Sequence, residues 1–444
     1  MEGVDYHHTY APVAHIESIM LMLSLAVHYK WFIHQMDIDN AYLNAELKED
    51  IYMTLPTQFR GTSEEGRVVK LKKSLYGLKQ AGNEWYGLLC ESLSGIGWTS
   101  CKKEYCIFVR TKDQLCEYIL LYVDDLLIFS PSEERMLKIK KEIIALFPAK
   151  DLGPVKHFLG MALTYDHESG SIAISQKSLI KSMYDQYKNQ LPIKIRNTPA
   201  DDGIYNIHED DAPCDKTVYQ SCIGALLYIA RFTRPDLLST ISILGRYAAQ
   251  PKVKHLEYLG GALGYLHHTQ DLRLTLKRTK NRDITAYSDA DYGSDRVTRR
   301  SMSGYVVRMG ENAISWKCKK QSLVATSTME SELVALAETT KEILWTKHIL
   351  EELKVENETV PLVYCDNQAA MQVASHPTNH DKSKHIDIKN LFMRDYVERG
   401  DIKIQYVSTN SNLADLFTKP VKKSKLQVTR EKLNVIGDRG SVKI

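Results

Sequence analysis

Two adjacent aspartates lie inside one of the most apolar stretches of this 444-residue sequence. Asp124 and Asp125 stand between the apolar runs 119–121 and 126–129. Burial would raise the pKa of both carboxyl groups, and their mutual repulsion would raise the pKa of one of them further. A hairpin that places the pair at its turn, with divalent cations bound, removes this conflict. The stretch therefore predicts two strands joined at the acid pair, although a solvated turn is the simpler interpretation of an Asp-Asp pair taken alone.

A third aspartate at another strand end favours the metal-binding interpretation. Asp37 follows the strand-like run 31–36. Nucleotidyl transfer needs carboxylates from separate strands to converge on two Mg²⁺ ions, one activating the 3′-hydroxyl and one holding the triphosphate. Asp37, Asp124 and Asp125 are therefore candidate metal ligands and catalytic residues.

Four further acids occupy strand ends or helix starts between residues 284 and 420. Three strand-like runs, a long helical pattern from residue 329 to about 353, and then alternating strands and helices predict a layered α/β architecture there. Any one acid alone is more often a surface residue or a helix cap. Hydrolysis of a phosphodiester by two metal ions, however, needs such a cluster of carboxylates. The candidates are Asp289, Glu332, Asp366 and Asp415, with Glu332 preferred over Glu330 because it precedes an apolar Leu-Val-Ala run.

Length and composition set the remaining bounds. A chain of 444 residues exceeds one hydrophobic core, so we expect two or three domains. The composition, 43% hydrophobic and 25% charged, excludes disordered and fibrous classes. The net charge of +3 says little about partners, because a balanced surface can still carry a basic groove. The eight cysteines form no C-x-x-C pair, and the apolar stretch Ile19–Val27 is too short for a bilayer, so we expect neither a zinc site nor a membrane partner.

The order of patterns along the chain suggests where domains begin and end. A polar, Pro-containing stretch covers residues 197–215, and apolar residues at helical spacing follow from 219 to about 270, with a break at Arg234-Pro235. We expect a first domain over residues 1–200, a helical connector over 201–280, a second domain over 281–420 and a loosely held basic tail over 421–444.

Several motifs resemble the reverse transcriptase and ribonuclease H of copia-type LTR retrotransposons. They occur in the family's order and cover almost the whole chain. The motifs are QMDIDNAYLN (35–44), SLYGLKQA (74–81), YVDD (122–125), DLG (151–153) with FLG (158–160), RSMSGY (300–305), ISW (314–316) and KHID (384–387).

This resemblance implies a multidomain α/β and α+β fold, with a right-hand polymerase palm and thumb, partial fingers, a helical connector and a ribonuclease H-like three-layer α/β domain. It implies an RNA-directed DNA polymerase joined to an RNA–DNA hybrid ribonuclease, with two Mg²⁺ ions per active site and Mn²⁺ as an alternative. The partners would be an RNA template, a DNA primer, the RNA–DNA hybrid and deoxynucleoside triphosphates. The family context adds a longer polyprotein with integrase and capsid regions, and a cytoplasmic virus-like particle with a nuclear stage.

The resemblance also implies residue roles. The seven acids named above would bind metal at the two sites. Tyr42 would lie beneath the incoming sugar and exclude a 2′-hydroxyl, whereas a buried aromatic at a strand-to-helix turn is the structural alternative. For the two lysines among the expected contacts, Lys79 and Lys384, the alternative is an exposed basic surface. Nucleotide or nucleic-acid contacts are expected from Tyr42, Tyr76, Gly77, Lys79, Gln80, Tyr122, Lys384 and His385.

Two departures from the family pattern leave other interpretations open. Gly82-Asn83 stands where the family usually has Pro-Arg. The string GVDY (3–6) resembles the middle of the family's domain, so we expect the upstream fingers segment to be absent from this sequence. One alternative is therefore a truncated element with a live ribonuclease H and a defective polymerase. Another is a non-catalytic nucleic-acid-binding relic.

Overall fold

The computed structural model describes residues 9–56, 58, 61, 66–207, 211–356, 359–375 and 392–437. The chain divides into two compact units, each considered by itself below. The first comprises Met1–Ile19, Tyr29–Val155 and Glu352–Lys354, and the second comprises Met20–His28, Lys156–Glu351 and Val355–Ile444. The mixed α/β, multidomain class predicted from the sequence is confirmed. The domain boundaries expected near residues 200 and 280 stay predictions.

The first unit is built on a six-stranded sheet with the order β4-β5-β6-β7-β1-β8. The strands are β1 (Phe32–Ile38), β4 (Thr99–Ser100), β5 (Ile107–Lys112), β6 (Leu115–Tyr122), β7 (Asp125–Ser130) and β8 (Ala149–Pro154). Residues 117–121 of β6 and 126–130 of β7 are all buried. Such a hairpin needs continuous apolar runs rather than an alternating pattern. The two strands predicted around the acid pair are both present.

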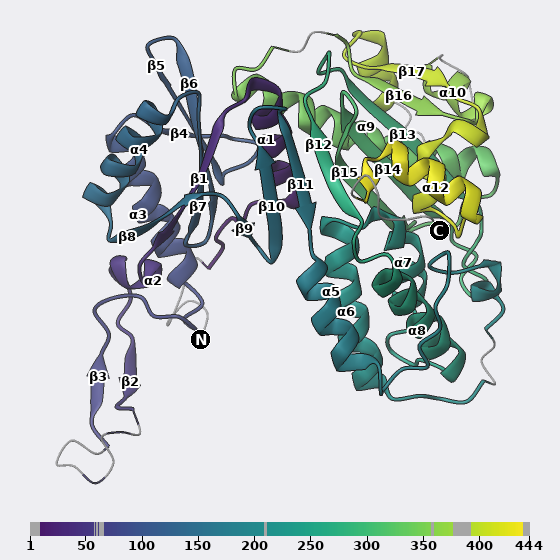
Figure 1. Cartoon of the computed structure of the whole chain (residues 1–444), viewed down its shortest axis with the longest axis horizontal. Coiled ribbons are helices and arrows are strands. Elements are labelled where there is room, and N and C mark those ends of the chain that lie inside the picture. The colour runs from purple at the N-terminus through teal and green to yellow at the C-terminus, as the bar shows by residue number, and fades with distance from the viewer. Residues whose placement is uncertain are drawn as a thin grey trace. The chain divides into compact units, whose positions relative to one another are not determined.

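Helices pack beside this sheet (Figure 1). The helices of this unit are α2 (Ala41–Asn44), α3 (Ala81–Gly95) and α4 (Glu133–Leu146), whereas α1 (Ile16–Tyr29) is divided, with residues 20–28 in the second unit. A separate hairpin joins β2 (Tyr52–Thr54) to β3 (Val68–Lys70). Helix α4 begins where the Ser132 side chain accepts a hydrogen bond from the Arg135 N–H, and it buries Met136, Ile139 and Ile143 at helical spacing. The helix expected from Leu75 begins only at Ala81.

The second unit contains a five-stranded sheet that the sequence did not predict, with the order β18-β12-β11-β10-β9. Its strands are β9 (His157–Phe158), β10 (Met161–Asp166), β11 (Ser171–Ser175), β12 (Arg273–Lys277) and β18 (Val435–Ile436). Strands β11 and β12 bury alternate residues and so pack one face against the core. Their pairing joins segments far apart in the sequence, which a local pattern does not reveal.

Residues 201–280, predicted as a helical connector, are mostly helical, and their role as a connector stays a prediction. The stretch contains the 3₁₀ turns η2 (Asp202–Tyr205) and η3 (Pro235–Leu237), the helices α6 (Lys216–Phe232), α7 (Leu238–Gly245) and α8 (Val253–His268), and the strand β12; helix α5 (Lys177–Tyr187) precedes it. The break expected at Arg234-Pro235 separates α6 from η3. There the side chains of Arg234 and Asp236, both 0% exposed, form a two-pronged ion pair at 3.0 and 2.8 Å.

The segment after Lys419, expected to be a loosely held tail, is ordered through residue 437, so this expectation is wrong. Helix α12 (Lys423–Lys432) buries Leu426, and the chain then buries Leu433 and pairs β18 with β12. The expectation failed because basic residues dominate the composition of this segment. Three buried apolar side chains, Leu426, Leu433 and Val435, nevertheless anchor it.

Histidine 255 in the first turn of α8 gives a prediction about pH. Its Nδ1 accepts a hydrogen bond from the Lys252 N–H at 2.9 Å. Burial lowers its pKa to about 4, with Asp211 opposing and Lys252 adding to the shift. Because the folded pKa lies below the unfolded value, the stabilising contribution is complete above about pH 6.5 and is lost as the pH falls toward 4. We expect His255→Gln to remove up to about 3 kcal/mol of the pH dependence of unfolding in this window.

Urea unfolding of the two proteins at pH 7, 5.5 and 4.5 measures this difference. Parallel pH dependences for the two proteins would contradict the assignment.

The second sheet of this unit has the order β15-β14-β13-β16-β17. Strands β13, β14 and β15 are antiparallel, and β13, β16 and β17 run parallel. This agrees with the predicted order of three antiparallel strands, a helix, a parallel strand, helices and a last strand, and the structure adds that the last strand, β17, is also parallel. The elements are β13 (Ile284–Asp291), β14 (Met302–Met309), β15 (Asn312–Lys320), α9 (Thr328–Glu352), β16 (Leu362–Cys365), α10 (Gln368–Ser375), helical residues 392–398, β17 (Lys403–Tyr406), η4 (Thr409–Ser411) and η5 (Leu413–Phe417).

The helix start expected near Asn412 is only a 3₁₀ turn, η5. The Asn412 side chain accepts a hydrogen bond from the Ala414 N–H at 3.0 Å and donates one to the Ser288 carbonyl at 2.9 Å. This second bond ties the turn to β13, so Asn412 holds a short element in place rather than starting a long helix. Within the described ranges, no helix is both long and apolar enough to cross a bilayer.

Candidate active sites

The first candidate site lies where β1 meets the β6–β7 hairpin. Asp37 of β1 is the direct cross-strand partner of Asp125 of β7. Asp124 lies in the turn between β6 and β7, where Tyr122 pairs with Asp125. The structure therefore brings together the three acids that the sequence proposed. In the part of the chain that the structure describes, they are not one of the groups whose ligand atoms all lie within 4.8 Å of one another.

The turn that presents Asp124 is strained. Val123 has a φ of +62°, a conformation that costs a β-branched residue on the order of 1–2 kcal/mol. Two hydrogen bonds hold it: the Trp85 indole donates to the Val123 carbonyl at 2.7 Å, and the Ile38 N–H donates to the Asp124 carbonyl at 3.0 Å. The backbone of the acid pair is thus fixed from α3 and from β1.

The charges of the first site repel one another. Burial raises the pKa of Asp125, and Asp124 and Asp37 raise it further, while the Gln35 amide donates to its Oδ1 at 2.9 Å and opposes the shift. Half-buried carboxylates that repel one another fit a divalent cation that would balance their charge.

The proposed nucleotide contacts surround this site unevenly. The rings of Tyr42 and Tyr76 lie 4.4 Å apart, and the Tyr76 hydroxyl donates to Asp124 Oδ2 at 3.4 Å. Tyr76, Gly77 and Lys79 are exposed, and Tyr122 is half-buried. Gln80, by contrast, is buried and donates to Glu49 Oε2 at 3.3 Å, so its amide already has a protein partner. The roles of these residues stay predictions.

The second candidate site is a tighter cluster of acids near β13 and β16, in the sheet with the order β15-β14-β13-β16-β17. Ligand oxygens of Asp289 (β13), Asp366 (after β16) and Asp415 (η5) lie within 4.8 Å of one another. Glu332 of α9 joins Cys365 and Asp366 in a second such group. Helix α10 is capped by Asn367, which accepts from the Ala370 N–H at 3.0 Å. The four acids proposed from the sequence therefore come together in space.

Two lysines that the sequence analysis did not select neutralise part of this cluster. The Lys419 ammonium lies 3.0 Å from Asp415 Oδ1 and 3.8 Å from Asp289 Oδ2. Lys425 of α12 contacts Asp415 Oδ2, and the Thr418 hydroxyl donates to Asp289. These ammonium groups would compete with a metal ion for the same oxygens. Only the contact of α12 with η5 reveals Lys425, so its sequence position carried no signal.

Glu332 is the most perturbed acid of the second site. Burial, followed by the charges of Asp289 and Asp366, raises its pKa to about 9. Its Oε1 accepts the Ala290 N–H at 3.3 Å, while its buried Oε2 has no hydrogen-bond partner. An unsatisfied carboxylate oxygen beside further carboxylates is a suitable ligand for a hard divalent cation. The cluster can therefore hold a metal ion, and binding would displace the proton of Glu332.

Gly304 of β14 sets how closely η5 approaches the sheet. It is the cross-strand partner of Asp289. A Cβ at this position would lie 2.7 Å from Thr418 Cγ2 and 2.8 Å from Phe417 Cβ. The missing side chain thus lets η5 bring Asp415 next to Asp289.

For the hybrid cleavage that the motif resemblance implies, we expect Gly304→Ala to displace η5 and lower the rate by about tenfold or more, at a stability cost of about 1–3 kcal/mol. Gly224→Ala on α6 is a matched control, because a Cβ there meets no atom within 4 Å. Cleavage rates and urea unfolding of both variants test this. Equal activity of the two variants would contradict the positioning role of Gly304.

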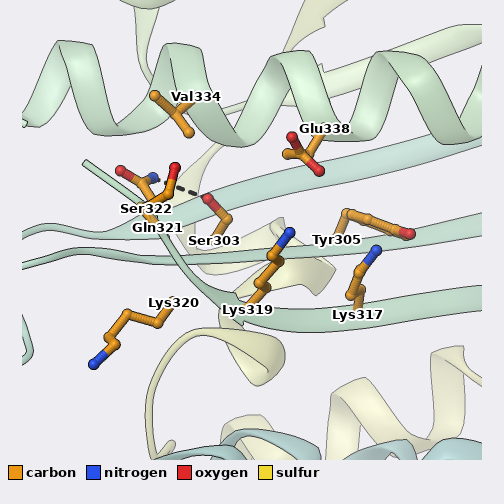
Figure 2. A pocket seen from close by; sticks show the side chains of 9 residues that line it. All are labelled: Ser303, Tyr305, Lys317, Lys319, Lys320, Gln321, Ser322, Val334 and Glu338. Atoms are coloured by element: carbon orange, nitrogen blue, oxygen red, sulfur yellow. Dashed lines mark hydrogen bonds between the residues drawn. The ribbon is translucent and has the colours of Figure 1, made fainter.

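Lys317 and Lys319 form a basic pair on the face of the sheet opposite to the Asp289 side chain. Figure 2 shows Lys317 and Lys319 of β15 reaching the same small pocket as Tyr305 of β14 and Glu338 of α9, while Lys320 points away. Lys320 instead pairs with Asp295 at 3.0 Å. This pair was not predicted from the sequence, although two lysines at alternate positions beside a strand-like run were the available signal. Lys384 and His385, which it did propose, lie outside the described residues.

Comparison with known proteins identifies the family. Residues 1–192 match the family model described as "Reverse transcriptase (RNA-dependent DNA polymerase)". The Pol polyprotein of transposon RE1 from Arabidopsis thaliana is 33% identical over 98% of this chain and 29% of its own length. That of transposon TNT 1-94 from Nicotiana tabacum is 32% identical over 97% of this chain and 33% of its own length. The chain thus spans about a third of these polyproteins.

A shorter relative is matched over its full length. The putative transposon Ty5-1 protein of Saccharomyces cerevisiae is 32% identical over 69% of this chain and 100% of its own. Among solved structures, a foamy viral protease-reverse transcriptase in complex with an RNA/DNA hybrid aligns with a TM-score of 0.49 and 12% identity, over 93% of this chain and 48% of that one. The resemblance stated from the motifs is confirmed, and this chain belongs to the copia-type retrotransposon Pol family.

Proposed function

We propose that this chain is an RNA-directed DNA polymerase that also cleaves the RNA of RNA–DNA hybrids, with Mg²⁺ at both sites and Mn²⁺ as an alternative. The observation that carries the proposal is the convergence of acids from separate elements at two places: Asp37 beside the Asp124-Asp125 turn, and Asp289, Asp366 and Asp415 within 4.8 Å. The family match supports the first activity, and the order of strands in the second sheet supports the second.

At the second site, Mg²⁺ would activate water and stabilise the leaving 3′-oxygen. Asp289, Asp366 and Asp415 would hold it, and Glu332 would complete the ligand set after losing its proton. Lys419 and Lys425 would keep the carboxylates charged before binding. Lys317 and Lys319, on the exposed face of β15, would contact phosphates of the hybrid backbone.

At the first site, Asp37, Asp124 and Asp125 would bind Mg²⁺, and the strained Val123 turn would hold Asp124 toward the primer end. Tyr76 and Lys79 are exposed and would contact the incoming deoxynucleoside triphosphate. An RNA template and a DNA primer would be the remaining partners. Integrase and capsid regions of the same polyprotein, and a cytoplasmic virus-like particle with a nuclear stage, complete the proposed setting.

The test uses the purified chain with two labelled substrates. One is an RNA–DNA hybrid, and the other is an RNA template with a DNA primer. We expect cleavage of the hybrid and extension of the primer with Mg²⁺, and neither with a chelator. Loss of hybrid cleavage in the presence of Mg²⁺ and Mn²⁺ alike would contradict the second activity, and loss of extension would contradict the first.

One observation favours a second candidate function, a live ribonuclease H with a defective polymerase. Of the two sites, the second contains groups of three ligands within 4.8 Å, and the first does not. Gly82-Asn83 adds to this, because it lacks the positive charge of the family's usual Pro-Arg. Cleavage without extension in the paired assay would select this candidate. Hybrid binding without metal-dependent activity would select the non-catalytic relic.

Tyr42 gives a prediction specific to the polymerase. Burial and the charge of Asp124 raise the pKa of its hydroxyl, so it stays protonated, and its ring packs on Tyr76. If this ring excludes the 2′-hydroxyl, Tyr42→Ala should increase the relative use of ribonucleotides by about tenfold or more. Tyr42→Phe, which keeps the ring, is the control. The ratio of kcat/KM for dNTP and rNTP measures the effect, and an unchanged ratio in Tyr42→Ala would refute the role.

A further inference from the structure

A second, separate cavity of about 540 Å³ lies in the second unit. Its walls come from the end of η2, the α7–α8 connection and the β13–β14 loop. Tyr205, Tyr247 and His255 supply aromatic surface, and Arg246 and Arg296 supply positive charge. The volume lies within the range of small-ligand sites in proteins.

Two buried side chains in this wall have unused hydrogen-bond donors. The Arg246 side chain is 9% exposed, with Nη1 3.7 Å from Asp295 Oδ2, while its Nε and Nη2 have no hydrogen-bond partner. His255 Nδ1 accepts from the Lys252 N–H, so the proton is on Nε2, which is also buried without a partner. Leaving a buried donor unsatisfied costs about 1–3 kcal/mol. A ligand rich in hydrogen-bond acceptors would satisfy these donors.

The charge of the cavity is positive despite Asp295. That carboxylate pairs with Lys320 at 3.0 Å and accepts the N–H groups of Val297 and Thr298 at 3.1 and 3.0 Å. Burial would raise its pKa, but the Thr298 N–H, Lys320 and Arg246 together lower it. Its negative charge is thus balanced from its own loop and from β15. Arg246, Arg296 and Lys252 then leave the cavity favourable for an anion.

The aromatic side of the cavity is also preorganised. The Tyr247 ring stacks on the His255 ring with centroids 4.0 Å apart and 27° between planes. Such a stack offers a flat surface on which a base can lie. Combined with a guanidinium, it matches the two parts of a nucleotide.

We infer that this cavity binds the phosphate group of a nucleotide, with Arg246 and His255 donating to its oxygens and the exposed lining residue Arg296 adding positive charge. A guanidinium whose Nε and Nη2 are both available suits a phosphate better than a single-point cation does. Two sources would offer this chemistry: the backbone of a nucleic-acid strand and a free nucleotide.

The position of the cavity favours a strand. Tyr205 in its wall donates to Asp291 Oδ2 at 3.2 Å, and Asp291 follows Asp289 by two residues on β13. A strand engaged at the second candidate site would therefore pass near this wall. The choice of a nucleic-acid strand as the ligand rests on the proposed ribonuclease function. The presence of a phosphate site does not depend on that function.

The test uses the full chain carrying Asp289→Asn, so that bound hybrid is not cleaved. Arg246→Gln and Arg296→Gln are introduced separately. Arg296 is exposed, so its removal leaves folding intact. Lys188→Gln is the matched control, because Lys188, which directly follows α5 and pairs with Asp185 at 2.7 Å, is an exposed positive charge of the same unit outside the cavity lining. Fluorescence anisotropy with a labelled RNA–DNA hybrid over a range of salt, and equilibrium dialysis with AMP, are the two readouts.

Phosphate binding from a strand predicts that each cavity variant weakens hybrid binding by about threefold to tenfold and lowers the salt slope by about one, while Lys188→Gln has no such effect. Weakened AMP binding with unchanged hybrid binding would retain the phosphate site and assign a free nucleotide. Unchanged affinity for both ligands overturns the inference. If the unsubstituted chain cleaves no hybrid but the cavity variants still weaken AMP binding, the phosphate site stands although the ribonuclease proposal fails.

Discussion

Replacing Asp289 by Asn is expected to lower cleavage of an RNA–DNA hybrid by on the order of a thousandfold while primer extension continues. The amide has nearly the same shape, so it can still accept the Thr418 hydroxyl. It carries no charge, however, and the cluster with Asp366 and Asp415 would no longer hold a divalent cation. The effect therefore follows from charge and not from packing.

The matched control is Glu330→Gln, an acid-to-amide change near the start of the same α9 that carries Glu332. Glu330 accepts the Thr326 N–H at 2.5 Å, and glutamine keeps this acceptor. We expect this variant to cleave at the parental rate. Single-turnover cleavage and circular dichroism of both variants decide the matter. Full activity in Asp289→Asn would show that the reaction does not use this cluster.

The largest expected effect on stability comes from Asp236→Ala. Asp236 and Arg234 are fully buried, and Arg234 also donates to the Thr269 carbonyl and hydroxyl at 3.0 and 2.7 Å. Tyr265 donates to Asp236 at 2.5 Å and accepts from Arg430 at 2.9 Å. Burial alone would raise the pKa of Asp236, but Arg234 outweighs it and keeps the carboxyl ionised. Removing this carboxylate leaves a buried guanidinium uncompensated, which costs about 3–5 kcal/mol.

A second variant separates the charge effect from simple loss of contacts. In Arg234→Met combined with Asp236→Leu, both charges are gone and the volume is largely kept. We expect this double variant to unfold at a higher urea concentration than Asp236→Ala, because no unpaired charge is buried. Equal or greater destabilisation of the double variant would mean that the pair stabilises the fold through its hydrogen bonds and not by mutual compensation.

Much of the fold could be read from local patterns. The strands around Asp124-Asp125 and the run from β13 to β16 were predictable because their apolar periods are regular and their partners follow closely in the sequence. The sheet of β9 to β12 and β18 was not, because its strands are short and β12 pairs with segments from distant parts of the chain. Helix α12 was not predicted, because lysines and other polar residues dominate its sequence.

The candidate sites divide in the same way. Acids at strand ends could be named because strand ends meet at one edge of a sheet, and the structure does bring Asp289, Asp366 and Asp415 together. Gly304, Lys425 and Arg246 could not be named, since their importance depends on packing between elements: η5 on β14, α12 on η5, and α7 beside the β13–β14 loop.

The pairing of β18 with β12 has a consequence for biosynthesis. Strand β12 is made long before Val435 and Ile436, so during translation its outer edge lacks a neighbour until almost all of this sequence has left the ribosome. Open strand edges pair readily with other chains. Nascent polypeptides that pause before this point therefore expose an edge of β12 that β18 covers in the folded chain.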